Sequence, residues 1–251
     1  YGRTVKYLAQ KKKNITPTHI YNYQVMLIRF LNHIAEQLHL PKIDFFLKQP
    51  AFSSKWHLDE DDVQRILKYN PTTQAQKDVL DIININKKIG LRIGEILNIL
   101  LDNITFDADA CYIRFLEEKK SKERTVVVVD KEAIDIIKSH MQNNNDKYLW
   151  RFHGYNWFNT VLQEQIAKEV FKEETVKIYK NTYAIDGYVS ILKWKAISSH
   201  AFRRFAIERN IVDYGIDVAR SLSGHSDTKI MFKHYADFMN SADLKNKLLG
   251  K

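Results

Sequence analysis

One stretch near the middle of the chain changes the spacing of its apolar residues from a helical to a strand pattern. Ile104–Phe106, Cys111–Leu116 and Thr125–Val129 are short β-branched or alternating segments. The turn residues Asp107–Asp109 and the basic segment Lys119–Arg124 separate them. Short strands in direct succession pair as antiparallel neighbours. Because the remaining chain has helical spacing, we predict a mainly α fold with a small antiparallel β-sheet, an α+β arrangement.

Apolar residues recur every three or four positions on both sides of this stretch, which predicts amphipathic helices. Pro17 favours a helix start, and the helix after it is expected to run to about Leu38. Asp59 is the expected N-cap of the next helix, and Gly90 is expected to end a later one just before Arg92 begins another. Further helices are expected at residues 131–141, 157–171 and 236–251, whereas residues 176–194 fit either a hairpin or a long loop.

A linker without periodicity at Gln49–Ser54 predicts a domain boundary. We therefore expect a small helical domain at residues 1–50 and a second domain at residues 55–251. The chain begins with Tyr1 rather than Met, so we expect the first domain to be truncated at its N-terminus.

Positive charge is concentrated at the start of the chain. Residues 1–56 hold nine Lys/Arg and two Asp/Glu, which accounts for most of the net charge of +9. This excess fits an anionic polymer or membrane partner, and charge alone favours it no more than a solvated basic face. If the partner is DNA, the candidate contacts are Lys11, Lys12, Lys13 and Arg29.

Several classes of protein are excluded by what the chain lacks. It has no apolar run long enough to span a membrane and no glycine-rich phosphate loop. Its single cysteine, Cys111, cannot form an intramolecular disulfide, and a cysteine-based zinc cluster is not expected. A reducing, cytoplasmic setting fits this cysteine content.

An ordered set of polar residues lies in the last third of the chain. His200 and Arg203 are three positions apart, which places them one helical turn from each other. His225 follows Gly224, and Tyr235 comes ten positions later. Arginine binds phosphate through a planar fork of donors, and a phenol can attack phosphorus. The set predicts a site that binds a phosphate and attacks it with tyrosine.

With Arg92 in Gly-Leu-Arg-Ile-Gly-Glu and Lys120 in the basic segment, this order of residues resembles the tyrosine recombinases, or phage integrase family. The resemblance covers residues 55 to 238. It implies a recombinase catalytic domain there and a helical, SAM-like core-binding domain in residues 1–50. It also implies a mobile-element integrase that lacks the upstream arm-binding domain of many members.

The resemblance implies a role for each residue. Tyr235 forms a 3′-phosphotyrosine with the scissile phosphate, Arg92 and Arg203 stabilise the charge, and Lys120 protonates the leaving 5′-oxygen. His200 acts as general acid/base. His225 hydrogen-bonds the phosphate, and Glu95 supports the site. Because two arginines replace a metal clamp, no metal or other cofactor is expected.

Alternatives remain at several positions. Lys119 and Lys122 compete with Lys120, which we prefer because Lys120-Ser121 matches the family's Lys-Thr step. Arg204 competes with Arg203 but does not fit the His-x-x-Arg spacing. Tyr214 competes with Tyr235 but precedes the Gly-His motif.

The resemblance implies double-stranded DNA as a partner, bound between the two domains, and no membrane. It implies a homo-tetramer on DNA joined through the C-terminal tail, although the tail's apolar face also fits packing within one chain. A type IB topoisomerase and a catalytically silent DNA-binding protein are the alternative functions.

Overall fold

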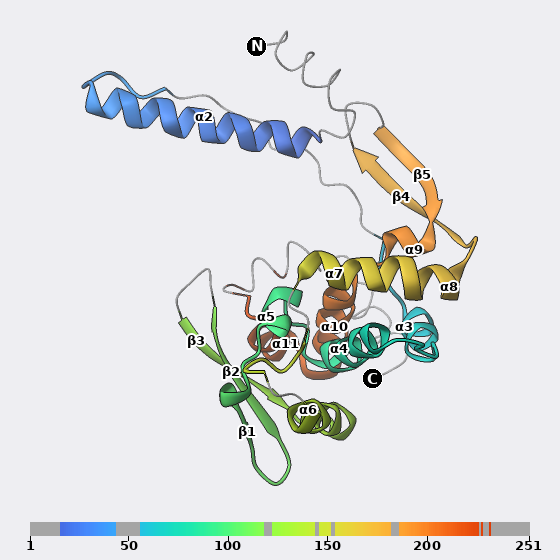
Figure 1. Cartoon of the computed structure of the whole chain (residues 1–251). Helices are drawn as coiled ribbons and strands as arrows, with labels where there is room; N and C mark the ends of the chain where they lie inside the picture. Colours follow the sequence, from blue (N-terminus) through green and yellow to red (C-terminus); the bar gives the residue numbers. More distant parts are fainter. Residues whose placement is uncertain are drawn as a thin grey trace, which may run out of the picture. The chain divides into compact units, whose positions relative to one another are not determined.

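The computed structural model describes residues 16–43, 56–117, 122–143, 146–151, 154–181, 186–225, 227 and 231. The chain divides into two units. Unit 1 holds Tyr1–Trp56 together with Thr175–Ile191, and unit 2 holds His57–Glu174 and Leu192–Lys251. Elements are labelled as in Figure 1.

The described part of unit 1 holds one helix and the strands of a two-stranded sheet. Helix α2 spans Pro17–Gln37, and its N-cap Thr16 forms a capping box with His19. Strands β4 (Thr175–Asn181) and β5 (Asp186–Leu192) pair with each other. The pairing of these two strands favours the hairpin over the long loop.

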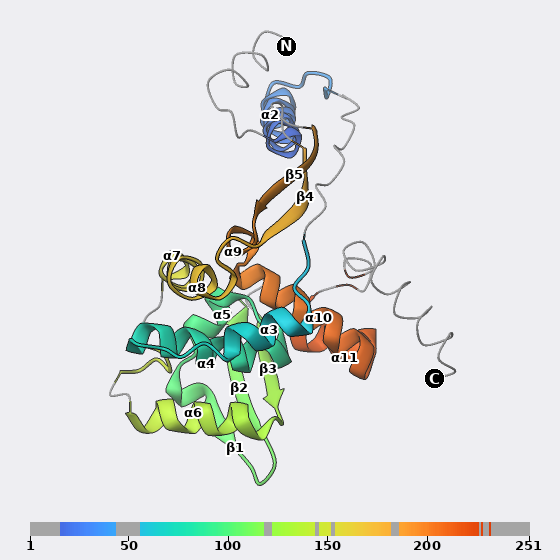
Figure 2. The same ribbon diagram turned by 90° about the vertical axis from the view of Figure 1, so that its right-hand side faces the viewer.

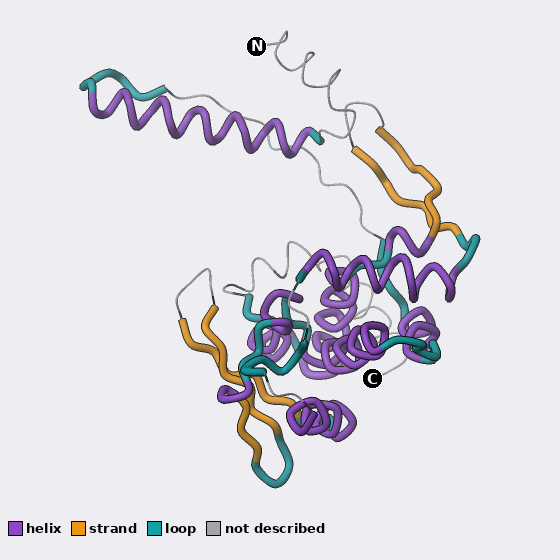
Figure 3. The backbone as a smooth tube through the Cα atoms, viewed as in Figure 1, coloured by secondary structure: helices purple, strands orange, loops and turns teal. Residues whose placement is uncertain are grey.

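Unit 2 is built mainly of helices. Asp59 caps the first of them by accepting a hydrogen bond from the N–H of Asp62, as its sequence predicts. The helical segments of this unit are α3 (Glu60–Leu67), α4 (Gln74–Ile89), α5 (Ile93–Leu97), η1 (Leu101–Asn103), α6 (Lys131–Asn143), α7 (Tyr155–Thr160), η2 (Val161–Ala167), α8 (Lys168–Phe171), α9 (Lys193–Ala196), α10 (Ser199–Tyr214) and α11 (Ile216–Ser223). Figure 3 shows α7, the π-helical η2 and α8 as one continuous helix.

Helix α4 lies at the centre of unit 2, in contact with α10, η2, α6 and α3. It buries apolar side chains on more than one side, including Val79, Ile82 and Ile85. Helix α10 supplies the facing residues Phe202 and Ala206, both almost fully buried. Burying these side chains is the main favourable term in folding this unit, and it fixes α10 against α4.

A three-stranded antiparallel sheet in the order β1-β2-β3 completes unit 2: β1 spans Ile104–Phe106, β2 Cys111–Glu117 and β3 Lys122–Val128. Cys111, Ile113 and Phe115 alternate toward the core, opposite Val128, Val126 and Arg124 in the register. In Figures 1 and 2 this sheet and α6 lie at the same end of the unit.

The mainly helical α+β prediction is confirmed. None of the helices within the described ranges has the length and apolar character needed to cross a bilayer.

Candidate active site

The turn between α4 and α5 places Arg92. Gly90 ends α4 with a φ of 68°, a left-handed conformation that glycine adopts at low cost. A Cβ atom there would lie 3.3 Å from side-chain atoms of Ala206 and Ile207, so the turn packs directly on α10. The buried amide of Asn86 holds the next residue, Leu91. Asn86 accepts a hydrogen bond from the Leu91 N–H at 2.7 Å and donates one to the Leu91 carbonyl at 3.1 Å.

Glu95 lies between three arginines. Its Oε1 accepts a hydrogen bond from Arg92 Nη1 at 2.8 Å, and its Oε2 accepts one from the Arg92 backbone N–H at 2.9 Å. The same Oε2 lies 3.7 Å from Arg124 Nη2 and 4.0 Å from Arg203 Nη1. Three guanidinium groups around one carboxylate leave a net formal charge of +2. Such a group favours an incoming phosphate.

Arg203 connects two turns of the site. Its side chain is 5% exposed; Nη1 donates to the carbonyl of Gly90 at 2.7 Å, and Nη2 donates to the carbonyl of Ser223 at 2.8 Å. The first carbonyl belongs to the turn before Arg92 and the second to the end of α11. Arg203 therefore holds together the turns that carry Arg92 and His225.

His225 follows a left-handed Gly224 with a φ of 71°, which ends α11. Its Nδ1 lies 2.7 Å from the hydroxyl of Ser223, which donates its hydrogen to the carbonyl of Ala219 at 2.7 Å. Because the hydroxyl has one hydrogen, Nδ1 of His225 is assigned as the donor in this contact. The Nδ1 edge of the ring therefore holds His225 against the end of α11.

His200 lies in the first turn of α10 and is exposed. The N-cap Ser198 accepts a hydrogen bond from the N–H of Ala201, and the carboxamide oxygen of Asn159 accepts one from the N–H of Ser199 at 2.9 Å. These contacts fix the start of the helix one turn before Arg203.

The structure thus brings Arg92, Glu95 and Arg203 into one cluster, and Ser223 links His225 to it. Arg29 is exposed on α2 in unit 1. The competing Arg204 is half-buried on α10. The predicted residues Lys120, Tyr235, Lys11, Lys12 and Lys13 lie outside the described residues, as do Lys119 and the helix expected at residues 236–251. In the described ranges, no group of three or more His, Cys, Asp or Glu side chains is placed to hold a metal ion.

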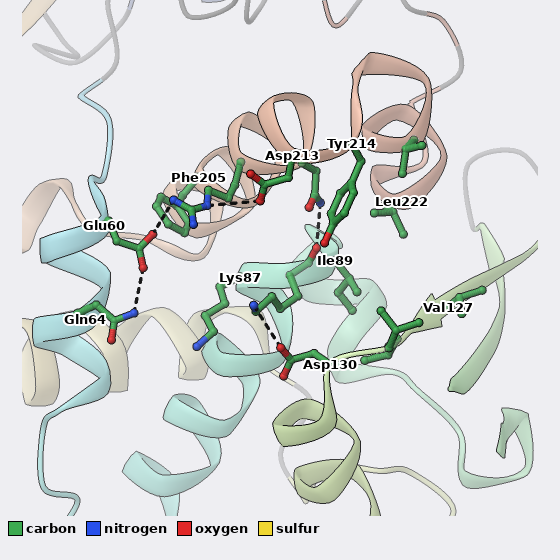
Figure 4. Close-up of a pocket in the computed structure, with 16 residues that line it drawn as sticks. Glu60, Gln64, Lys87, Ile89, Val127, Asp130, Phe205, Asp213, Tyr214 and Leu222 are labelled. Carbon is green, nitrogen blue, oxygen red and sulfur yellow. Dashed lines mark hydrogen bonds and ion pairs between the residues drawn. The ribbon is translucent and has the colours of Figure 1, made fainter. Parts of the chain in front are cut away.

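Tyr214 lies elsewhere in unit 2, at the end of α10. It borders a cavity of about 510 Å³ that Figure 4 shows between α3, the end of α4, β3, α10 and α11. Apart from Tyr214, none of the described candidate residues lines this cavity. Its walls are formed by Glu60, Gln64, Lys87, Lys88, Ile89, Val127, Val128, Val129, Asp130, Phe205, Arg209, Asn210, Asp213, Tyr214, Val218 and Leu222.

Sequence reasoning missed three residues that shape the cluster: Asn86, Ser223 and Arg124. A signal for Arg124 was present, because it precedes the buried Val126 and Val128 at a spacing of two, which places it on the core face of β3. The carbonyl and amide contacts of Asn86 and Ser223 depend on turn geometry and have no comparable sequence signal.

Comparison with known proteins identifies a family that matches most of the chain. The model of the phage integrase family matches residues 57–241. The match begins at His57, which is also the first residue of unit 2. No curated protein matches the chain by sequence.

Solved structures share the fold at low sequence identity. The XerH site-specific recombinase bound to palindromic difH substrate, in a post-cleavage complex, has a TM-score of 0.69 at 11% identity, over 99% of this chain and 72% of that chain. The Tn1549 transposon integrase in complex with circular intermediate DNA has a TM-score of 0.63 at 15% identity, over 91% of this chain and 78% of that chain. The XerA recombinase has a TM-score of 0.51 at 15% identity, over 91% of this chain and 82% of that chain.

Proposed function

The chain belongs to the phage integrase family of tyrosine site-specific recombinases, and we propose that Tyr235 is its nucleophile. In this mechanism the Tyr235 oxygen attacks the scissile phosphorus and the bond from phosphorus to the 5′-oxygen breaks. The covalent 3′-phosphotyrosine keeps the energy of the broken bond, so rejoining to another 5′-hydroxyl needs no energy cofactor.

The arginine cluster around Glu95 is the observation that carries this proposal. The phosphoryl transition state concentrates negative charge on the non-bridging oxygens, and preorganised cations stabilise it. The Arg92 side chain is 44% exposed, so its guanidinium is accessible to a phosphate while Glu95 holds one edge of it. Arg203 contributes its charge from the buried side of the cluster. No metal is needed for this stabilisation.

Two further groups move protons in the proposed mechanism. His200 accepts the proton from the Tyr235 hydroxyl, and Lys120 donates a proton to the departing 5′-oxygen. His225 donates a hydrogen bond to the phosphate from Nε2. Because its Nδ1 already donates to Ser223, this requires the protonated imidazolium.

The position of Met231 supports Tyr235 as the nucleophile. Met231 is fully buried against Ile207 of α10 and Ala219 of α11, the helices that hold Arg203 and lead into His225. Tyr235 follows Met231 by four residues, which span at most about 14 Å, and we therefore propose that Tyr235 can reach the arginine cluster.

We assign DNA contacts outside the site to the basic N-terminal segment. Lys11, Lys12, Lys13 and Arg29 belong to the proposed core-binding domain, residues 1–50, and would bind the phosphate backbone opposite the catalytic domain, residues 55–251. We propose that the reaction takes place in the cytoplasm of a bacterial cell, on the DNA of the nucleoid.

The proposed active assembly is a homo-tetramer on DNA, in which the C-terminal tail of one protomer docks on the next. Leu244 and Leu248, four positions apart, would form one face of a tail helix. Part of the wall of the cavity in Figure 4 is apolar, and in this part Val129 is 70% and Val218 44% exposed.

A nicked suicide DNA substrate tests the nucleophile. Wild-type protein is expected to form a covalent adduct that survives denaturation, and Tyr235→Phe is expected to form none, whereas Tyr214→Phe is expected to match wild type. Adduct formation should be unchanged by EDTA. Absence of a wild-type adduct would support a silent DNA-binding protein. Relaxation of plasmid lacking any specific site would support the topoisomerase alternative.

Tail docking is tested by changing the cavity wall. Val129→Glu and Val218→Glu are expected to reduce tetramers on DNA, measured by native mass or crosslinking, while adduct formation by single protomers persists. Val212→Glu is the matched control, because Val212 is 47% exposed on α10 but does not line the cavity. If tetramers form equally well in all three variants, the tail docks elsewhere or within its own chain.

A further inference from the structure

The cluster contains a third arginine, Arg124, which the resemblance to the family did not assign to the site. Arg124 lies on β3, opposite Phe115 of β2 in the register. Its guanidinium carbon lies 4.7 Å from the centre of the Phe115 ring, and its side chain is 13% exposed. A cation held over an aromatic ring at low exposure has a restricted position. The side chain is therefore directed toward the core of unit 2.

From this position Arg124 reaches Glu95. Arg124 Nη2 lies 3.7 Å from Glu95 Oε2, and the Glu95 side chain is 14% exposed. Charges at such low exposure are screened less by solvent and salt than surface pairs are. The same Oε2 accepts the backbone N–H of Arg92, while Oε1 holds the Arg92 guanidinium. The Glu95 carboxylate thus contacts both Arg124 and Arg92, the arginine that is proposed to bind the phosphate.

We propose that Arg124 is a positioning residue of the recombinase active site, acting through Glu95 on Arg92. The charge of Arg124 attracts Oε2, while Oε1 accepts the hydrogen bond from the Arg92 guanidinium. Without Arg124, the second cation beside the Glu95 carboxylate, within the ranges that the structure describes, is Arg203 at 4.0 Å. This inference rests on the proposed recombinase function and adds a residue to it.

A second consequence concerns the segment between β2 and β3. Arg124 lies two residues after Lys122, where β3 begins. The contact with Glu95 therefore ties the base of this hairpin to the α5 turn. The proposed Lys120 lies four residues before Arg124.

The test is single-turnover cleavage of the nicked suicide substrate at saturating DNA. Arg124→Met is expected to slow adduct formation about 10- to 100-fold, the cost of misplacing a catalytic group by about 1 Å, while the dissociation constant for DNA stays within about twofold of the control. Arg114→Met is the matched control. It removes an exposed arginine from β2. Arg114 is next to Phe115 in the chain, but the side chain of Arg114 lies on the opposite face of the sheet from Arg124.

A double-mutant cycle identifies the route of the effect. If Arg124 acts through Glu95, the Arg124→Met and Glu95→Gln pair is expected to cleave no more slowly than Glu95→Gln alone. The proposal would be overturned if the double variant slowed cleavage by the product of the two single fold-changes. It would also be overturned if Arg124→Met cleaved at the wild-type rate. If Arg124→Met does not fold, Arg124→Lys carries the test: it is expected to retain DNA binding and to cleave at an intermediate rate, and a wild-type rate would overturn the proposal. Adduct formation by wild type in the same assay separates these outcomes from failure of the proposed function.

Discussion

At the scale of single residues, Arg203 and Arg92 use the same side chain for different purposes. Arg203 satisfies two backbone carbonyls from a buried position, whereas Arg92 is half exposed and pairs with Glu95. Buried hydrogen bonds to a charged group contribute more than exposed ion pairs do. Substitutions of the two arginines should therefore change the free energy of unfolding by different amounts, even if both arginines act in catalysis.

Arg203→Lys is expected to lower the free energy of unfolding by about 3 kcal/mol, because a lysine cannot donate to both carbonyls and leaves one buried and unpaired. Arg92→Lys is expected to lower it by less than about 1 kcal/mol, as for exposed pairs. Urea unfolding of both variants measures the difference. Equal losses would show that the two carbonyl contacts of Arg203 contribute little.

At the scale of elements, the turns at helix ends position the site. Gly90 combines a positive φ with close approach to α10, so an added side chain meets both strain and crowding. Gly94, in α5, has no heavy atom within 4 Å of the position of an added Cβ. These two glycines lie on either side of Arg92, and we expect a side chain to be tolerated at Gly94 but not at Gly90.

Gly90→Ala is expected to lower the free energy of unfolding by about 1–3 kcal/mol, the usual cost of a strained backbone position. It should also slow cleavage by moving the Arg92 turn. Gly94→Ala is expected to be neutral or to stabilise by up to about 1 kcal/mol, since alanine favours the helix. Thermal unfolding compares the pair, and a stable Gly90→Ala would contradict the close contact with α10.

A second element-scale feature is the group of charges at the base of the β4–β5 hairpin, within unit 2. Glu174 immediately precedes β4, and Lys193 immediately follows β5. Arg65 of α3 donates to both Glu174 oxygens, at 2.5 and 3.2 Å. Lys193 contacts Glu174 at 3.5 Å and pairs with the buried Asp62. The hydrogen bond from Arg65 lowers the pKa of Glu174 below its ordinary value of 4.5, and Lys193 adds to this effect.

Glu174→Gln should therefore destabilise the protein in a pH-dependent way. A carboxyl with a lowered folded pKa stabilises the native state above its unfolded pKa, and this contribution is lost as the pH falls through the folded pKa. The stability difference from wild type is expected in full at pH 7, should begin to shrink as the pH falls below about 4.5, and should be lost once the pH lies below the folded pKa of Glu174. Unfolding at a series of pH values measures it, with the exposed neighbour Glu173→Gln as control. A difference of the same size at every pH, with no decline on the acid side of pH 4.5, would exclude the charge as its cause.

At the scale of the whole molecule, the excess positive charge and the proposed catalytic cluster lie in different parts of the chain. Most of the excess positive charge lies in residues 1–56, whereas the arginine cluster lies in unit 2. Non-specific affinity for DNA depends on the number of phosphates neutralised, and catalysis depends on the placement of a few groups. Changes in the first segment should therefore affect binding and leave chemistry intact.

Changing Lys11, Lys12 and Lys13 to glutamine is expected to weaken DNA binding and to reduce the slope of log affinity against log salt by up to about 2.7, or about 0.9 for each phosphate that is no longer neutralised. The rate of cleavage at saturating DNA should stay unchanged. The matched control changes the exposed Lys68, Lys77 and Lys131 of unit 2. Equal slopes for the two triple variants would mean that the basic N-terminal segment does not contact the phosphates.

The sequence alone determined the local features of this protein. It predicted the Asp59 cap, the Gly90 stop, the three strands and the mainly helical fold, because caps, turns and side-chain alternation act over a few residues. The tertiary structure decided what Arg203 and Arg124 contact. Arg203 meets a carbonyl 113 positions away, and Arg124 meets Glu95 across the strand–helix interface. Such contacts depend on how α10, α5 and β3 pack around α4, and packing between distant segments follows no spacing rule along the chain.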